Sequence, residues 1–468
     1  MVVNLVGVGC ALASDRIAIR LTPIGRAPQL VTQRITWADV EPLRGRLEAH
    51  GLTAKTFSSY VERLHASNLR RVREGDLDHL VFYMLQGTRF TSLPAIEPAL
   101  SAKELVDGLN ATERETFLAT SRTRAQRIPP AVRARAVALV AAIDSPATDP
   151  RLEYFRAIVQ AAAPSADRRE DMLTREYLRA MRFLYEKEFV AQQAGADAVA
   201  ALYRTRGLST DTAVEAGYLV YLGLGVLKAL EPVRQVRRVL IIGPGLDVAP
   251  RTGLIDVGPP ESYQPWAVID ALVALRLSRV DELQIVAADI NPRVVDHLRR
   301  SRAAPPVLTL TSGIRESDSV MFSREYRDYF DGLGRAIGKV DATAARAIDG
   351  GRLQKVVGVS GAAARTVDSE LLDVAIERDA GTPFDVVIAT NILPYFDEVE
   401  LMLALSNIAR MLGPDGVLLH NESRASMRDT TETLGMPLEQ SRQAIIAAVR
   451  DAPGPLVDRV YLHRKKVQ

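Results

Sequence analysis

The sequence has almost no cysteine and few histidines, which limits the kinds of site it can build. Its 468 residues include a single cysteine, Cys10. No internal disulfide can therefore form, and no cluster of thiols can hold zinc or an iron–sulfur centre. The six histidines show no metal-ligand spacing with one another or with paired acids; they are His50, His65, His79, His297, His420 and His463. We predict no metal site.

The chain also lacks a large excess of charge of either sign and lacks a long apolar run. Its 59 Lys and Arg residues against 57 Asp and Glu give a formal net charge of +2, so no general attraction to nucleic acid is expected. No uninterrupted apolar run of about 18 residues suggests a membrane span. Residues 1–20 begin apolar without a positively charged n-region, so whether they are a remnant export signal stays open. The cysteine usage favours a cytoplasmic location.

Residues 37–230 show helical periodicity nearly throughout. Hydrophobic residues make up 47% of the chain and charged residues 25%, as in ordinary globular proteins, and the length allows two or three domains. Capping-box patterns, in which an acceptor precedes a Glu by three residues, occur at Ser101, Asn110 and Thr212 and predict that helices begin there. We predict an α-helical domain over 37–230, after an uncertain N-terminal segment over 1–36.

After Pro232 the pattern changes to alternating strands and helices. Apolar, β-branched runs predict strands at 236–242, 283–288, 384–390 and 416–420. Amphipathic stretches predict intervening helices at 265–277, 292–300 and 398–412. This alternation is typical of a parallel sheet covered on both faces, so we predict an α/β domain over 231–468.

A long stretch, about 301–381, does not fit a simple crossover between two strands. It contains a helical pattern at 324–337 and short strand candidates at 355–359 and 366–372. We predict that part of it is an insertion.

The first predicted strand ends in the glycine-rich sequence Gly243-Pro244-Gly245. Glycine tolerates positive φ and has no Cβ, so such a turn lets a ligand approach the backbone at the carboxyl edge of the sheet. The alternative is a plain turn that joins a strand to the next segment.

The second predicted strand ends at Asp289, followed by Ile290 and Asn291. A carboxylate in this position can accept hydrogen bonds from both hydroxyls of a ribose. The alternative is an N-cap carboxylate for the helix that begins near Pro292. A dinucleotide-binding motif would place a third glycine where the chain has Val248, which disfavours NAD.

At this point the chain resembles the class I S-adenosylmethionine-dependent methyltransferases. The resemblance covers about 236–423 and rests on four elements in the family's order, namely the glycine-rich sequence at 241–245, Asp289, the strand at 384–391 and the turn at 411–416. The chain departs from the family in its long segment between Gly245 and Asp289, and at Asp415, which replaces a glycine.

The resemblance implies a Rossmann-like class I methyltransferase sheet, preceded here by the helical domain, and S-adenosyl-L-methionine as cofactor. The cofactor-binding residues that it implies are Gly243, Pro244, Gly245, Asp289, Ile290, Asn291, Asp373 and Asn391. The family's adenine-contacting acid matches Asp373 best, with Asp368 as the alternative.

A narrower similarity links the sequence at 391–396 and 419–423 to the chemotaxis-receptor glutamate methyltransferases. Those enzymes have an arginine where this chain has Thr390. We therefore do not carry their substrate over.

The catalytic group is not evident from the sequence, and three residues are candidates. Asn391 ends a strand, Tyr395 could stack on the methyl acceptor, and His420 ends the last predicted strand, where it could act as a general base. The alternatives are helix packing for Tyr395 and a buried structural role for His420. Upstream, the polar loop at 204–212 could close over the cofactor carboxylate through Arg204 or Arg206, or could simply cap the next helix.

Taken together, these patterns predict a methyltransferase whose acceptor, a small molecule or a protein, is unknown. Two alternatives stay open, a nucleotide-dependent oxidoreductase and a non-catalytic S-adenosylmethionine-binding sensor or scaffold.

Overall fold

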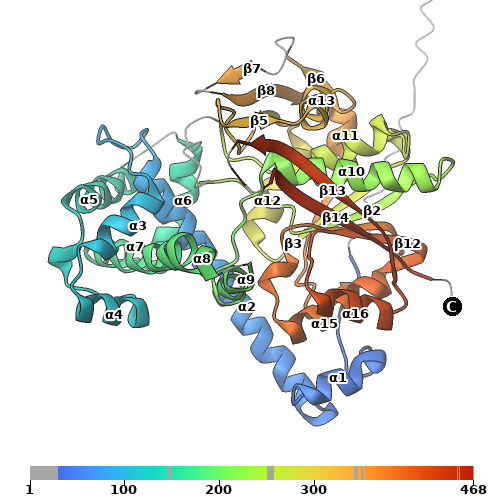
Figure 1. Cartoon of the computed structure of the whole chain (residues 1–468), viewed down its shortest axis with the longest axis horizontal. Coiled ribbons are helices and arrows are strands. Elements are labelled where there is room, and N and C mark those ends of the chain that lie inside the picture. The colour runs from blue at the N-terminus through green and yellow to red at the C-terminus, as the bar shows by residue number, and fades with distance from the viewer. Residues whose placement is uncertain are drawn as a thin grey trace, which may run out of the picture.

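The computed structural model describes residues 30–145, 149–194, 196–249, 258–341, 346–348, 351–450, 452 and 454–466. Residues 1–20, and with them the question of an export signal, lie outside these ranges. Figure 1 shows a lobe of helices beside a larger lobe built around a sheet, with the long helix α2 running between them.

The chain before the sheet is helical, as the periodicity predicts. No strand occurs between 37 and 230 in the part of that range that the structure describes. Its α-helices are α1 (Arg44–Ala49), α2 (Ala54–Gln86), α3 (Pro98–Asp107), α4 (Ala111–Thr120), α5 (Pro130–Asp144), α6 (Pro150–Ala162), α7 (Arg169–Tyr185), α8 (Gln192–Ala194), α9 (Ala196–Thr205) and α10 (Val214–Leu230).

Only one of the three predicted capping boxes begins a helix. Asn110 and Glu113 exchange both hydrogen bonds of the motif at the start of α4. Ser101 instead lies inside α3, and the residue before α10 is Ala213, which has no capping side chain. The other two predictions are wrong because both acceptors are used elsewhere: Ser101 bonds to Tyr177, and Thr212 donates to backbone carbonyls.

The predicted α/β class, a Rossmann-like sheet preceded by helices, is confirmed. The strand order of the main sheet is β5-β13-β14-β12-β11-β2-β3-β9. The parallel strands are β2 (Arg238–Ile242), β3 (Gln284–Asp289), β9 (Val367–Leu371), β11 (Phe384–Ala389) and β12 (Leu412–His420). The antiparallel end consists of β5 (Val320–Phe322), β13 (Leu438–Val449) and β14 (Leu456–Arg464). The last two strands were not expected from the sequence.

Neighbouring residues of the central strands enter two different cores. In β2, Val239 and Ile241 join the core that α10 and α11 (Gln264–Ala274) share with the helical lobe. Leu240 and Ile242 join the core under α15 (Glu398–Met411), to which the start of α2 also belongs. Because alternate residues of a strand enter cores on opposite faces of the sheet, both sets are apolar. The strands therefore appear in the sequence as continuous apolar runs.

The stretch 301–381 contains a small second sheet, and its description as an insertion stays a prediction. Its antiparallel strands are β4 (Val307–Thr311), β6 (Gly338–Val340), β7 (Arg346–Ile348) and β8 (Arg352–Val359). The helix α13 (Arg324–Gly332) ends earlier than the predicted 337, and α14 (Gly361–Thr366) leads into β9. The short strand β1 (Thr32–Arg34) pairs with β10 (Glu377–Asp379) outside the main sheet.

The domain boundaries at 36/37 and 230/231 stay predictions. The helix α10, on the N-terminal side of the second boundary, packs against α11, β13 and β14. Two further helices complete the sheet lobe, α12 (Pro292–Ala303) and α16 (Ala425–Thr433). Over the described ranges, no helix is long and apolar enough to cross a membrane, and no group of three or more His, Cys, Asp or Glu side chains could hold a metal ion.

Candidate cofactor and acceptor site

Two adjoining cavities lie at the carboxyl edge of the parallel strands. The chain leaves β2 toward β3 and β9 on one side and returns to β11 and β12 on the other, so the strand order reverses beside β2. Ligands of open α/β sheets bind at such a point. The smaller cavity is lined from the ends of β2, β3, β9 and β11, by residues that include Gly243, Asp289, Asp373 and Asn391.

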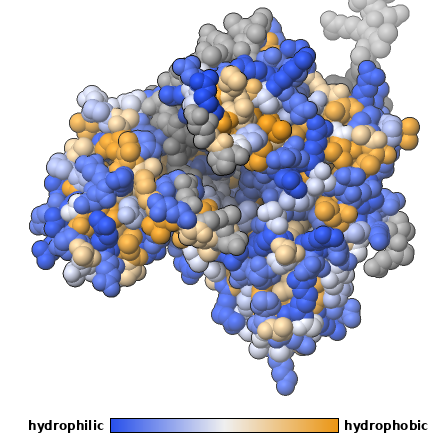
Figure 2. Space-filling model, viewed as in Figure 1, coloured by the Kyte–Doolittle hydropathy of each residue, from blue (hydrophilic) through white to orange (hydrophobic). Residues whose placement is uncertain are grey.

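The larger cavity, of about 440 Å³, continues from the smaller one. Asn391 and Tyr395 line both cavities, as do Asp211 and Thr212. Figure 2 shows a recess in the surface between the helical lobe and the sheet lobe.

The glycine turn has the positive φ angles that the sequence suggested. At Gly245, however, the missing Cβ makes room for another part of the same chain. Gly243 has φ +65° and Gly245 has φ +76°. A Cβ on Gly245 would lie 1.9 Å from Thr212 Oγ1 and 2.6 Å from the carbonyl oxygen of Thr210. The space beside Gly245 is therefore filled by a neighbouring loop of the same chain. Both glycines line the smaller cavity, whereas Pro244 lines neither cavity.

Asp289 lies at the rim of the smaller cavity and is 7% exposed. One carboxylate oxygen accepts from the backbone N–H of Asn291 at 2.8 Å, and burial raises the pKa of Asp289 to about 7. The side chain that caps α12 is Asn291, which accepts from the N–H of Arg293. The N-cap alternative for Asp289 is therefore wrong. Ile290 and Asn291 also line this cavity.

Of the two candidate acids near the end of the 301–381 stretch, Asp373 lines the smaller cavity. It is 5% exposed and accepts from Asn68 Nδ2 at 2.9 Å. Asp368 lines neither cavity and pairs with Arg302 on α12.

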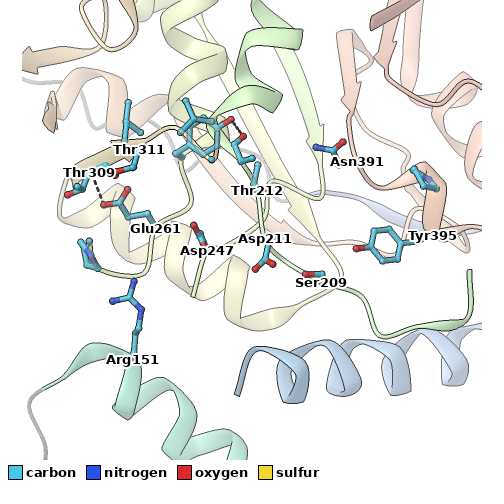
Figure 3. A pocket seen from close by; sticks show the side chains of 18 of the residues that line it. Arg151, Ser209, Asp211, Thr212, Asp247, Glu261, Thr309, Thr311, Asn391 and Tyr395 are labelled. Carbon is cyan, nitrogen blue, oxygen red and sulfur yellow. Dashed lines mark hydrogen bonds between the residues drawn. The ribbon is translucent and has the colours of Figure 1, made fainter. Parts of the chain in front are cut away.

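Asn391 has a strained backbone and a side chain that a neighbour fixes. Its φ is +62°, in the left-handed region. Asn421 Oδ1 accepts from the backbone N–H of Asn391 at 2.9 Å, and Asn421 Nδ2 donates to Asn391 Oδ1 at 2.7 Å. Figure 3 shows the amide nitrogen of Asn391 turned toward the larger cavity. Tyr395, across from it, contacts Tyr203 of α9 edge to face.

His420, the third catalytic candidate, lines neither cavity. Its ring is 1% exposed and lies between the rings of Tyr461 and His463 on β14. Nδ1 accepts from the N–H of Glu422, and burial lowers the pKa of His420 well below its usual value. This position corrects the expectation of a general base, because the buried ring lines neither cavity.

The sequence reasoning missed the contribution of α2 to the smaller cavity. Polar side chains are buried along one stripe of this helix, at Asn68, Arg71, Asp76 and His79. Asn68 and Val72 line the cavity, and Asp76 accepts from Asn291 Nδ2 at 3.0 Å. Because α2 carries polar and charged residues over most of its length, its sequence alone does not mark which of them are buried.

The loop between α9 and α10 is clamped between α2 and the glycine turn. Arg71 donates to the carbonyl oxygens of Arg206 and Tyr395, at 3.0 and 2.8 Å. The N–H of Leu246 donates to the carbonyl oxygen of Thr210 at 2.8 Å. Gly75 allows this contact, because a Cβ there would lie 1.8 Å from the carbonyl oxygen of Leu208. Residues 208–212 of the loop thus line the smaller cavity.

The side chain of Arg206 is held by contacts with other helices. It pairs with Asp78 of α2 and lies 4.2 Å from the ring centre of Phe183. Its side chain reaches the larger cavity, not the smaller one.

Carboxylates gather on the far wall of the larger cavity (Figure 3). Asp247 and Glu261 exchange backbone hydrogen bonds, and Glu261 Oε1 accepts from the N–H of Thr309 at 2.6 Å. Burial raises the pKa of Glu261 to about 7 and that of Asp247 well above its usual value. Arg151 of α6 reaches the same wall and donates to the carbonyl oxygen of Val248.

No protein-family model matches the chain, and no curated protein matches it significantly. Solved structures to which it is similar include a TehB-like SAM-dependent methyltransferase from Corynebacterium glutamicum, with 13% identity over 52% of this chain and 86% of that chain, at a TM-score of 0.25. The N-methyltransferase NodS from Bradyrhizobium japonicum, in complex with S-adenosyl-L-homocysteine, has 11% identity over 52% and 84%, at a TM-score of 0.26.

A third similar structure is the magnesium protoporphyrin IX methyltransferase ChlM from Synechocystis with bound SAH. It has 10% identity and covers 62% of this chain and 100% of that chain, at a TM-score of 0.28. Because these TM-scores are low, we infer the function from the geometry of the site.

Proposed function

We propose that this chain is an enzyme that binds S-adenosyl-L-methionine and transfers its methyl group to an acceptor in the larger cavity. The observation that carries the proposal is the position of Asp289. Its buried carboxylate lies at the end of β3, beside the glycine turn of β2, where the strand order reverses. A ribose with two free hydroxyls would find an acceptor there.

The residues at this edge fit a single nucleoside better than a dinucleotide. A pyrophosphate is usually held by a helix that starts directly at the glycine turn. Here the described residues 246–249 after the turn are not helical, and α11 begins only at Gln264. The smaller cavity offers carboxylates and apolar walls, which suit a nucleoside, and no cluster of cations for a pyrophosphate.

The larger cavity is suited to a small-molecule acceptor. A volume of about 440 Å³ lies within the range of pockets that enclose small ligands. Its entrance from the smaller cavity is bordered by Asn391 and Tyr395. These side chains would contact an acceptor that lies where the two cavities meet.

The bound cofactor would supply an electrophilic methyl group. Holding two reactants in line lowers the barrier without a dedicated acid or base. Asn391 would contribute a hydrogen-bond donor, since Asn421 fixes its amide with the nitrogen turned toward the cavity. The α2 helix and the loop over 206–212 would exclude water from the cofactor side.

Calorimetric titration with S-adenosylmethionine, S-adenosylhomocysteine and NAD tests the cofactor. We expect saturable binding of the first two and none of NAD. Binding of NAD alone would favour an oxidoreductase.

Transfer of a labelled methyl group to fractions of a cell extract tests the reaction. We expect label in a small-molecule fraction with the wild type and none with the Asp289→Ala variant. Binding without any transfer would instead indicate a sensor or scaffold.

A further inference from the structure

Asn68 on α2 is a buried polar side chain with one atom unused. It is 2% exposed and lines the smaller cavity. Its Nδ2 donates to Asp373 Oδ2 at 2.9 Å, whereas its Oδ1 is buried and has no hydrogen-bond partner among the described residues. A buried acceptor without a donor is costly, so such an atom calls for a ligand.

The orientation of the Asn68 amide follows from its neighbour. An ionised carboxylate only accepts hydrogen bonds, so the Asn68 nitrogen must face Asp373 and the oxygen must face away. Burial raises the pKa of Asp373 to about 6, which is still below 7, so this carboxyl is mostly ionised at neutral pH. Asp373 Oδ1 accepts from the N–H of Ala375. The hydrogen-bonding capacity that this pair leaves unused is therefore that of acceptors.

The walls around this pair are apolar. Val72 of α2, Leu372, Val374 and Phe396 are all buried and line the same cavity. A flat base fits between such walls, and two acceptors at one end match a group that carries two N–H donors.

We propose that Asn68 Oδ1 accepts one N–H of the 6-amino group of adenine, beside Asp373, the acid that the family resemblance already assigns to adenine, and that Asn68 thereby determines which base the site takes. This inference rests on the proposed function. It makes the helical region part of the cofactor site. A 6-oxo base would turn an oxygen toward both acceptors and be rejected.

The test compares the affinities of two ligands, S-adenosylhomocysteine and S-inosylhomocysteine, which carries oxygen in place of the 6-amino group. We expect the wild type to bind the adenosine compound at least about 30-fold more tightly. In Asn68→Leu, which has nearly the same volume and no acceptor, this ratio should fall about tenfold.

Two further variants separate base recognition from a general loss of binding. Asp289→Asn should weaken both ligands and leave the ratio unchanged, since Asp289 faces the ribose. Asn68→Asp should leave the ratio of the two affinities unchanged. Two adjacent carboxyls share a proton, so the pair still presents an acceptor to the 6-amino group. If Asn68→Leu does not fold, Asn68→Ser carries the same measurement.

An unchanged ratio in a folded Asn68 variant that still binds S-adenosylhomocysteine would overturn the inference and leave the proposed function intact. Failure of the wild type to bind S-adenosylhomocysteine at all would overturn both.

Discussion

The two sides of the smaller cavity are built in different ways. The sheet side consists of strand ends, where Gly243, Asp289 and Asn391 follow apolar runs directly. The helix side consists of α2 and the loop over 206–212, whose residues lie far away in the sequence. Local pattern determines the first side, and tertiary packing determines the second. A site formed by both should fail when either side is altered.

The largest effect is expected on the sheet side, at Asp289. Replacing Asp289 with Ala removes an acceptor for two ribose hydroxyls, so affinity for S-adenosylmethionine should fall by about 2–4 kcal/mol, or about 30- to 1000-fold. Because Asn291 caps α12, the melting temperature should change little. Calorimetry and thermal unfolding of the same variant measure both quantities.

Asp368→Ala is the matched control, since that acid lies on the neighbouring strand outside both cavities. It should bind the cofactor normally. Equal losses in the two variants would mean that Asp289 has no specific role.

The second largest effect is expected at Gly245, where the glycine turn of the sheet side contacts the loop of the helix side. Gly245→Ala places a Cβ against Thr212 at positive φ, so we expect a loss of about 2 kcal/mol in the free energy of unfolding together with weaker cofactor binding. Chemical denaturation measures the first quantity.

Gly225, within α10, serves as the control because nothing lies within 4 Å of an added Cβ. Gly225→Ala should be neutral or stabilising by up to about 1 kcal/mol. A Gly245→Ala protein as stable as the wild type would contradict the close contact of the loop.

A smaller change in cofactor affinity is expected when the pH is varied. The pKa of Asp289 is raised to about 7 in the folded protein, and ribose hydroxyls prefer its ionised form. Cofactor affinity should therefore rise as the pH increases through 7, by up to about tenfold. The same protonation means that the empty protein loses stability as pH rises from about 4 to 7. Titrations between pH 6 and 8 measure the affinity, and Asp289→Asn should remove most of the dependence.

The smallest effect is expected at His420. Its ring lies between Tyr461 and His463, away from both cavities. His420→Gln should leave cofactor affinity within about twofold while lowering the melting temperature. Loss of methyl transfer in a stable His420→Gln protein would restore the general-base hypothesis.

The sequence could predict the sheet side because each strand carries its own signal. The β-branched run of β2 and its glycines are contiguous, and Asp289 is the last residue of β3. The strands β13 and β14 were missed because their outer faces are polar and their alternation is interrupted by register shifts.

The helix side could not be predicted from local pattern. Asn68 and Asp373 lie 305 positions apart, and the sequence around Asn68 does not indicate that the two residues are in contact. Gly245 was expected to make room for a ligand, but the Thr212 side chain and the carbonyl oxygen of Thr210 occupy that space. Only the folded chain reveals which group an added side chain would meet.

A crystal structure of the complex with S-adenosylhomocysteine tests most directly whether both sides form one cofactor site. We expect the ribose hydroxyls within hydrogen-bond distance of Asp289, and the base between Val72 and Phe396 with its amino group at Asn68. A ligand bound elsewhere, or one that contacts the strand ends without touching α2, would contradict this arrangement.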